Sequence, residues 1–343
     1  MKRSPRSTFC LILVAGVIGA ACGTPADAQQ PRATIGGVHR ADPRLDALVE
    51  PGATLEVLAE GFEWTEGPVW VSNGGYLLFS DIPRNTIYRW KEGEGLSVFM
   101  RPAGYSGPEP FGDELGTNGL LLDAAGNLVA ASHGDRGMVR IDTVKFTKTP
   151  LAERYDGKRL NSPNDAVYHS NGDLYFTDPS YGLRGLDDSP VKELPFNGVY
   201  RLSADGAVTL LTDTLSFPNG IAFSPDERTL YVAISGPQSY WAAYDVQPDG
   251  TLARGRVFFD AAALRTEGRR GGADGMAVDV HGNLFATGPG GVVVFSPDGT
   301  YLGTIETGQA TANVTFGDDG STLYVTADMY LARIPTKTKG LGF

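Results

Sequence analysis

Six short stretches of the sequence begin with a residue whose side chain carries an oxygen, and these oxygens could together hold a hard metal ion. After this residue each stretch continues into a short apolar strand, a turn rich in Asp, Asn or Gly, and a second strand. We call the first residues the strand-start residues: Glu66, Asn118, Asn164, Asn219, Asp274 and Asn313. Carboxylate and amide oxygens are ligands that Ca²⁺ and Mg²⁺ prefer. The predicted metal site consists of two acids that neutralise a divalent cation, Glu66 and Asp274, and two amides that orient it, Asn164 and Asn219.

The competing interpretation of each Asn is structural, because Asn at the start of a strand often closes a turn or bonds backbone groups. For a single Asn that interpretation would be preferred. It loses force here because Asn or an acid occupies the same place in all six stretches. Ca²⁺ is the predicted cation, and Mg²⁺, Zn²⁺ and Mn²⁺ are the alternatives.

The spacing of the strand-start residues predicts the fold that positions them. Successive members are 52, 46, 55, 55 and 39 residues apart, which is about the period of four-stranded propeller blades. One blade cannot bury both of its faces, so blades must pack around an axis, and their first strands start at the same end of the central channel. The sequence therefore predicts an all-β, six-bladed β-propeller with the strand-start residues in a ring at one mouth.

The two ends of the repeat predict how the ring closes. Residues 54–63 have the pattern of a strand ahead of the first blade, and the last stretch, from Ala312, lacks a fourth strand. The N-terminal strand would complete the last blade and remove two open sheet edges. Two irregular insertions, at 101–116 and 181–196, interrupt the pattern. The first is expected to lie over the mouth because it leads into Asn118.

The chain is predicted to have three parts: a signal peptide at 1–28, a flexible segment at 29–44 and the propeller domain at 45–340. The signal combines a basic start, an apolar run too short to span a membrane, and an A-x-A cleavage site ending at Ala28. It predicts a periplasmic or secreted bacterial protein, with a lipid anchor at Cys22 as the alternative. Both cysteines, Cys10 and Cys22, lie in this signal, so no disulfide or thiolate metal ligand is predicted in the mature chain.

The net charge of the chain limits the classes of partner that it is expected to bind. The formal net charge is −11, which repels phosphate backbones and argues against a nucleic-acid partner. No transmembrane segment is predicted. The expected partner is a small molecule that binds at the predicted mouth.

Four segments resemble the motifs of the gluconolactonase/regucalcin family: EGPVW, SPND, FPNGIAFSPD and DGMAVDVHGNL. The resemblance covers nearly the whole mature chain and is strongest to the exported bacterial gluconolactonase branch. It implies a six-bladed propeller with a central divalent cation. By this resemblance Glu66, Asn219 and Asp274 match metal ligands, and Asn164 matches an Asn that binds the metal or contacts substrate. The chain departs from the regucalcin type at Ser162, where those members carry Arg, and this leaves the exact lactone open.

The resemblance implies metal-dependent hydrolysis of a sugar-type lactone to the hydroxy acid. Asp274 is the predicted catalytic residue, because one of its oxygens could bind the ion while the other accepts a proton from water. His133 and Asn118 are predicted substrate contacts, and His133 is also the competing base. Asp165 adjoins Asn164 but should point the opposite way along a strand. Two other functions stay open: an organophosphate or ester hydrolase of the diisopropylfluorophosphatase type, and a non-catalytic binding propeller.

Overall fold

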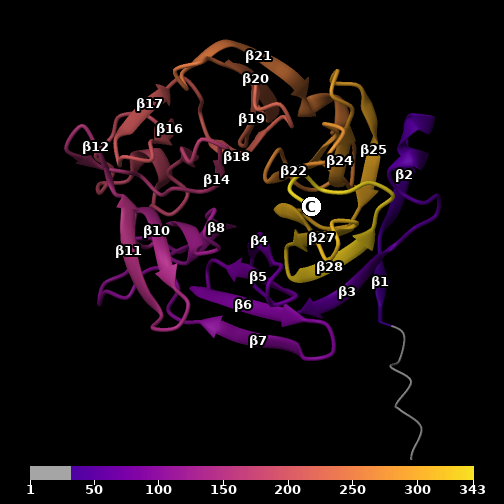
Figure 1. Ribbon diagram of the computed structural model, residues 1–343, viewed down its shortest axis with the longest axis horizontal. Coiled ribbons are helices and arrows are strands. Elements are labelled where there is room, and N and C mark those ends of the chain that lie inside the picture. The colour runs from indigo at the N-terminus through magenta and orange to yellow at the C-terminus, as the bar shows by residue number, and fades with distance from the viewer. Residues whose placement is uncertain (1–31) are drawn as a thin grey trace, which may run out of the picture. The chain divides into compact units, whose positions relative to one another are not determined.

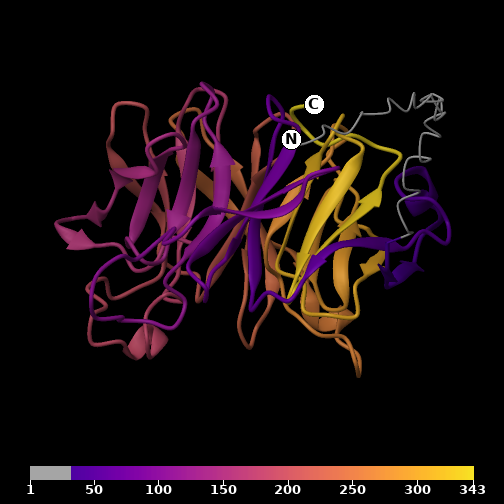
Figure 2. The same ribbon diagram turned by 90° about the horizontal axis from the view of Figure 1, so that it is seen from below.

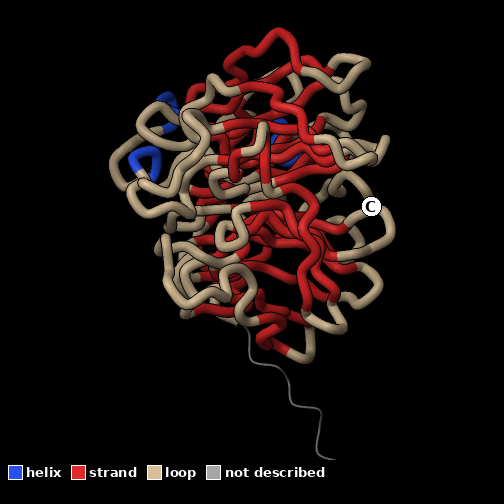
Figure 3. The backbone as a smooth tube through the Cα atoms, turned by 90° about the vertical axis from the view of Figure 1, so that its left-hand side faces the viewer, coloured by secondary structure: helices blue, strands red, loops and turns tan. Residues whose placement is uncertain are grey.

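The computed structural model describes residues 32–343, and the regular structure of this part of the chain is almost all β-strand, joined by turns and by several longer loops (Figure 3). Its strands form six antiparallel sheets of four or five strands, arranged as blades around a common centre (Figure 1). Figure 2 shows the same blades from the side. The predicted six-bladed β-propeller is confirmed. The predicted signal peptide, residues 1–28, lies outside the described residues.

Blades 1 to 4 are meanders of four consecutive strands, each strand paired with the next along the chain. Blade 1 contains β4 (Thr65–Val71), β5 (Tyr76–Asp81), β6 (Thr86–Lys91) and β7 (Gly95–Met100), and blade 2 contains β8 (Thr117–Leu122), β9 (Leu128–Ser132), β10 (Gly137–Asp142) and β11 (Thr147–Ala152). Blade 3 contains β14 (Ala166–Tyr168), β15 (Leu174–Asp178), β16 (Gly198–Leu202) and β17 (Val208–Thr212). Blade 4 contains β18 (Pro218–Phe223), β19 (Thr229–Ile234), β20 (Tyr240–Val246) and β21 (Leu252–Asp260). A two-stranded ribbon, β12 (Arg154–Tyr155) and β13 (Lys158–Arg159), follows blade 2.

Blades 5 and 6 take strands from both ends of the described chain. Their C-terminal strands are β22 (Met276–Val278), β23 (Leu284–Gly288), β24 (Gly291–Phe295), β25 (Tyr301–Glu306), β26 (Asn313–Gly317), β27 (Thr322–Ala327) and β28 (Tyr330–Pro335). Blade 6 is completed by β3 (Leu55–Glu60), which pairs antiparallel with β28. This confirms the predicted closure by an N-terminal strand.

The segment predicted to be flexible, 29–44, contains two strands in its described part. β1 (Thr34–Ile35) pairs with β3 in blade 6, and β2 (Gly37–Arg40) pairs with β25 in blade 5. Gly36 makes the crossing between them at φ +64°, where a Cβ would lie 1.6 Å from the carbonyl oxygen of Glu306. Strands of two and four residues are too short to show an alternating pattern, and the backbone of the outer strands supplies their hydrogen bonds. The sequence therefore gave no sign of them.

The apolar residues of the described chain do not form one core but six clusters, each shared by two neighbouring blades. The cluster between blades 6 and 1 contains Phe79, Trp90 and Tyr324, all buried. Burial at every blade junction makes the ring rigid, because no blade can move without exposing apolar surface on both sides. A rigid ring fixes the distances between the first strands of different blades.

Helical structure is confined to short 3₁₀ turns at η1 (Pro43–Ala47), η2 (Leu186–Asp188) and η3 (Ala261–Leu264). Within residues 32–343 no helix has the length and apolar character needed to cross a membrane.

Candidate functional site

Five of the six strand-start residues line one cavity of about 340 Å³: Glu66, Asn118, Asn164, Asn219 and Asp274. Each comes from a different blade and lies within or just before that blade's first strand. Asn313 is not among the lining residues. Its Nδ2 donates to Glu66 Oε2 at 3.2 Å, and its Oδ1 accepts the N–H of Val314 at 2.8 Å. The amide of Asn313 is thus used within the protein and supports Glu66 from behind.

Glycines after the strand-start residues allow the first strands of neighbouring blades to approach each other. A Cβ on Gly67 would lie 2.0 Å from the carbonyl oxygen of Asn118 in the next blade, and a Cβ on Gly220 would lie 2.3 Å from that of Asp274. These separations are far below van der Waals contact, so the close approach requires glycine. The Glu-Gly, Asn-Gly and Asp-Gly pairs of the sequence are therefore explained by strand packing at the channel.

Hydroxyl groups tie the second strand of one blade to the start of the next. In four blades a Ser or Thr near the end of the second strand donates to a backbone carbonyl at or beside the next strand-start residue. The pairs are Ser80 to Asn118 (2.9 Å), Thr177 to Asn219 (2.7 Å), Ser235 to Ala273 (2.6 Å) and Thr287 to Ala312 (2.8 Å). The lining side chains consequently project from a backbone that is bonded on both sides.

The cavity brings together the carboxyl groups of the buried Glu66 and the half-buried Asp274. Burial raises the pKa of Glu66, and the charge of Asp165 adds to the rise. Burial and the charge of Glu66 hold the pKa of Asp274 well above its ordinary value. Both shifts express the cost of burying negative charge and of placing it close to other carboxylates. Asp274 Oδ1 is buried and has no hydrogen-bond partner among the described residues.

The amide of Asn219 is oriented by its neighbours. Ser235 Oγ uses its proton in the bond to the Ala273 carbonyl, so it accepts from Asn219 Nδ2 at 3.0 Å. With its NH₂ group engaged there, Asn219 has only its oxygen left to offer a ligand. Asn164 supplies a further amide to the cavity lining.

Asn118 and His133 occupy different positions in the site. Asn118 lines the cavity, and its Oδ1 is buried without a hydrogen-bond partner among the described residues. His133 is fully buried and is not among the lining residues. Its Nε2 lies 3.5 Å from Asn118 Nδ2, and its Nδ1 lies 3.2 Å from the carbonyl oxygen of Glu114. Burial lowers the pKa of His133 to about 4.

The lining residues that were not singled out from the sequence include three ionisable groups outside the repeated strand pattern: Glu114, Tyr181 and Arg265. Burial, with the charge of Asp113, raises the pKa of Glu114 to about 7. Tyr181 stacks on Phe217 with ring centroids 5.3 Å apart. The one available signal was the expected position of insertion 101–116, which contains Glu114, over the mouth.

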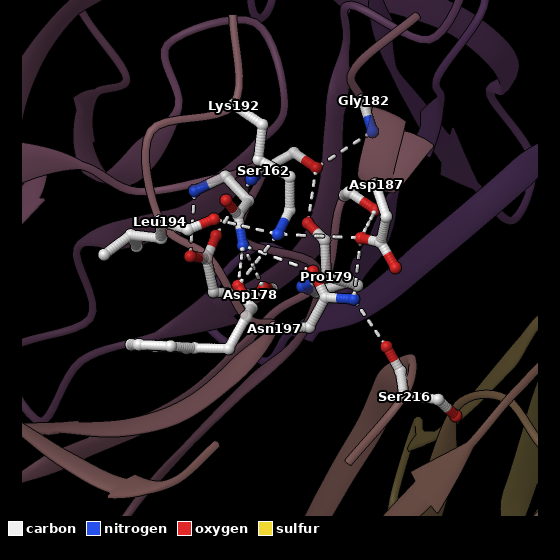
Figure 4. Close-up of polar contacts among 12 residues, drawn as sticks. Ser162, Asp178, Pro179, Gly182, Asp187, Lys192, Leu194, Asn197 and Ser216 are labelled. Atoms are coloured by element: carbon white, nitrogen blue, oxygen red, sulfur yellow. Dashed lines mark hydrogen bonds and ion pairs between the residues drawn. The ribbon is translucent and has the colours of Figure 1, made fainter. Parts of the chain in front are cut away.

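Ser162, which replaces the Arg of the regucalcin type, is buried in a polar network beside the cavity (Figure 4). Asp178 Oδ2 and Oδ1 accept the N–H groups of Asn161 and Ser162, each at 2.8 Å. Ser162 Oγ donates to Pro179 O at 2.7 Å and accepts the N–H of Gly182 at 2.9 Å. The network fixes the chain on both sides of the cavity, just before Asn164 and around Tyr181.

The lining residues fit a hard divalent cation. Among residues 32–343, no three His, Cys, Asp or Glu side chains gather closely enough to bind a metal by themselves. The groups that do gather are the carboxyls of Glu66 and Asp274 and the amides of Asn164 and Asn219, with an unpartnered oxygen on Asp274. Such an oxygen-only set suits Ca²⁺ or Mg²⁺ with water completing the shell, and does not suit a thiolate or imidazole site.

Asp165 points away from this cavity, as the alternation along a strand predicts. It lines a separate groove of about 600 Å³. Its carboxylate accepts the N–H groups of Ala166 at 2.9 Å and Ile221 at 3.3 Å. Asp165 therefore bonds the backbone of two blades and acts on the cavity through its charge.

The chain was compared with known families, proteins and structures. Residues 64–328 match the family described as the SMP-30/Gluconolactonase/LRE-like region. The gluconolactonase of Zymomonas mobilis is 42% identical over 320 residues, which cover 90% of this chain and 88% of that protein. A solved gluconolactonase from Xanthomonas campestris is 32% identical, with a TM-score of 0.76 over 90% of this chain and 99% of that one. The diisopropyl-fluorophosphatase of Loligo vulgaris is 25% identical over 261 residues, covering 74% of this chain and 80% of that protein. The family match spans most of the chain and the resemblance drawn from its motifs is confirmed: this protein belongs to the SMP-30/gluconolactonase/LRE-like family.

Proposed function

We propose that this protein hydrolyses a sugar-type lactone to its hydroxy acid with the help of a divalent cation. The observation that carries the proposal is the convergence of the buried Glu66 and the half-buried Asp274 with the amides of Asn164 and Asn219 in one cavity. The gluconolactonase of Zymomonas mobilis, at 42% identity, supports the same reaction. Glu66, Asn164, Asn219 and Asp274 would hold the ion. We expect Ca²⁺ first, because amide oxygens and an irregular shell suit it better than Mg²⁺, Zn²⁺ or Mn²⁺.

The side chains of the cavity can perform the other steps of lactone opening. The chemistry that a bound divalent cation supplies is polarisation of the lactone carbonyl and stabilisation of the negative charge that develops on its oxygen. Asp274 has an oxygen without a partner among the described residues and can accept the proton of the attacking water. Burial raises the pKa of Glu114 to about 7, so its protonated form is well populated at neutral pH and can give its proton to the departing ring oxygen. His133 does not line the cavity, which favours Asp274 over His133 as the base.

The test is to assay the purified protein on glucono-δ-lactone by acid release before and after exhaustive chelation. We expect activity to fall to the uncatalysed rate and to return with Ca²⁺. Parallel arms restore Mg²⁺, Mn²⁺ or Zn²⁺, and others replace the lactone with diisopropyl fluorophosphate. Full activity after chelation would refute the metal requirement. Hydrolysis of the fluorophosphate alone would favour an organophosphate hydrolase, and no turnover of either would favour a binding propeller.

We further propose export of the protein by residues 1–28 to the periplasm or the medium. The basic start, short apolar run and Ala26-Asp27-Ala28 support this. The mass of the protein recovered from cells tests it. A chain that begins at Gln29 is expected, a lipid-modified Cys22 would favour the anchored alternative, and a retained signal would refute export.

A further inference from the structure

We infer that His133 is a positioning residue that turns the oxygen of Asn118 into the cavity, where it accepts a hydrogen bond from a hydroxyl group of the substrate. The inference rests on the proposed lactone hydrolysis for the identity of the ligand. The orientation of Asn118 does not depend on that function, because it follows from hydrogen bonds within the protein.

The proton of His133 is placed by its surroundings. A backbone carbonyl can only accept, so the Nδ1 atom that lies 3.2 Å from Glu114 O must carry the ring proton. Oε2 of the Glu114 side chain lies 3.9 Å from the same nitrogen and is a second acceptor on that side. The ring is fully buried, which favours its neutral form. A neutral ring with its proton on Nδ1 has an acceptor at Nε2.

This acceptor determines which end of the Asn118 amide enters the cavity. Nε2 lies 3.5 Å from the terminal amide of Asn118, and only an NH₂ group can donate to it. The oxygen must then face the other way. Oδ1 is the buried atom of Asn118 that has no partner among the described residues, and Asn118 lines the cavity. Asn118 is thus an acceptor toward the ligand, as Asn219 is through its bond to Ser235.

The ring is held against rotation by packing from the second insertion. A Cβ on Gly182 would lie 2.7 Å from His133 Cβ and 2.8 Å from Ser162 Cβ, so the backbone there leaves no space beside the imidazole. Glu114, which fixes the proton, belongs to the first insertion. The two insertions therefore set the orientation of Asn118 without contacting it.

An acceptor at this point selects a substrate by its hydroxyl groups. A buried oxygen without a partner costs about 1–3 kcal/mol, which a donor on the ligand can recover. A lactone carries such donors only when its ring is hydroxylated. The geometry therefore favours polyhydroxylated lactones over unsubstituted ones.

The first arm of the test reads the proton position by long-range ¹H–¹⁵N correlation spectra of the imidazole rings. The chain has four histidines, and the resonance lost in His133→Gln identifies this one. We expect a neutral ring protonated on Nδ1. In Asn118→Asp the partner of Nε2 becomes an acceptor, and we expect Nε2 to become protonated. A wild-type ring protonated on Nε2, or no change in Asn118→Asp, would overturn the inference whether or not the protein is a lactonase.

The second arm compares glucono-δ-lactone with δ-valerolactone, which has no ring hydroxyls. His133→Phe removes the acceptor, and we expect KM for the hydroxylated lactone to rise about tenfold with little change for δ-valerolactone. His133→Gln can offer an oxygen to Asn118 and should restore most of the loss. His169→Phe is the matched control, because His169 lines a different surface groove and not the cavity of the candidate site; it should alter the turnover of neither substrate. Equal effects on both lactones would refute a hydroxyl contact. If His133→Phe does not fold, Asn118→Ala gives the same comparison.

Discussion

Replacing Glu66 by Gln should change the thermal stability of the protein in opposite directions without and with the cation. Gln has nearly the shape of Glu and keeps an oxygen that can accept the N–H of Gly67 and the amide of Asn313. The substitution removes only the buried charge. Without a cation that charge is unfavourable, because burial raises the pKa of Glu66. With a cation it is one of the two charges that neutralise the ion.

The size of both effects can be estimated. Each unit by which a folded carboxyl pKa exceeds its ordinary value costs about 1.4 kcal/mol at a pH above both values. For a domain of this size each such unit corresponds to about 3 °C in melting temperature, so cation-free Glu66→Gln should melt at a higher temperature than the wild type. Wild type should gain about 2.7 kcal/mol, or roughly 5 °C, at a cation concentration a hundredfold above its Kd. Most of this gain should be absent in the variant.

The assay is differential scanning calorimetry at pH 9, above the pKa of about 8 that burial gives Glu66, after chelation and in a Ca²⁺ titration. Glu114→Gln is the matched control, because it also removes a cavity carboxyl but from an insertion and not from a strand start. It should retain the gain from Ca²⁺. The reasoning is refuted if Glu66→Gln keeps the full gain, or if Glu114→Gln loses as much.

Three further predictions concern turnover, pH and ring closure. Asp274→Asn should keep an ion, more weakly, and lose about 10²–10⁴-fold in kcat, measured by acid release; near-native kcat would exclude Asp274 as the base. The rate of hydrolysis should fall as pH rises through about 7, because the acidic form of Glu114 supplies the proton. The pH–rate profile of Glu114→Gln should lack this fall in rate. An unchanged profile would show that Glu114 takes no part in the reaction. Leu55→Ala, which leaves a cavity at a buried position on β3, should lower the free energy of unfolding in urea by about 2–5 kcal/mol. Deletion of 32–40, a segment that has fewer buried residues than β3, should lower it less. The reverse order would contradict closure of the ring by β3.

The repeated strands could be predicted from the sequence because the first strand of each of the six blades must meet the same structural requirements. Each first strand must start at the channel, pass close to its neighbour and turn back, so the same residue types return at each start. The predicted strand at 54–63 was found for the same reason, since the last blade lacked a partner. β1 and β2 follow no such rule. β1 and β2 pair with the outer edges of β3 and β25, which are already paired on their other side. They are held there by backbone hydrogen bonds, which nearly any sequence can make.

The candidate site was only partly readable because the use of an amide depends on residues from other blades. Asn313 and Asn219 occupy matching positions in their blades. Both ends of the Asn313 amide make hydrogen bonds within the protein, to Glu66 and Val314. Asn219 uses only its NH₂ group in this way, so its oxygen remains available to the cavity. No local pattern separates them. His133 illustrates the same limit, since its side chain lies behind Asn118 and not in the cavity.

The ring and the insertions contribute different parts of the site. Glu66 lies in β4 and Asp274 lies just before β22. Asn313 of blade 6 donates to Glu66, and Ser235 of blade 4 donates to the carbonyl of Ala273 beside Asp274. Such bonds between blades can keep the two carboxyls close together despite their repulsion. Glu114 and Tyr181 come from insertions that are outside the repeat. An insertion can change in length or sequence without altering the packing between blades, whereas a change at a strand start alters both neighbours. The groups proposed to hold the cation therefore depend on the fold itself, whereas the insertions supply Glu114 and Tyr181 and orient Asn118 through His133. Ser162 anchors the start of the insertion at 181–196 through its bonds to Pro179 and Gly182.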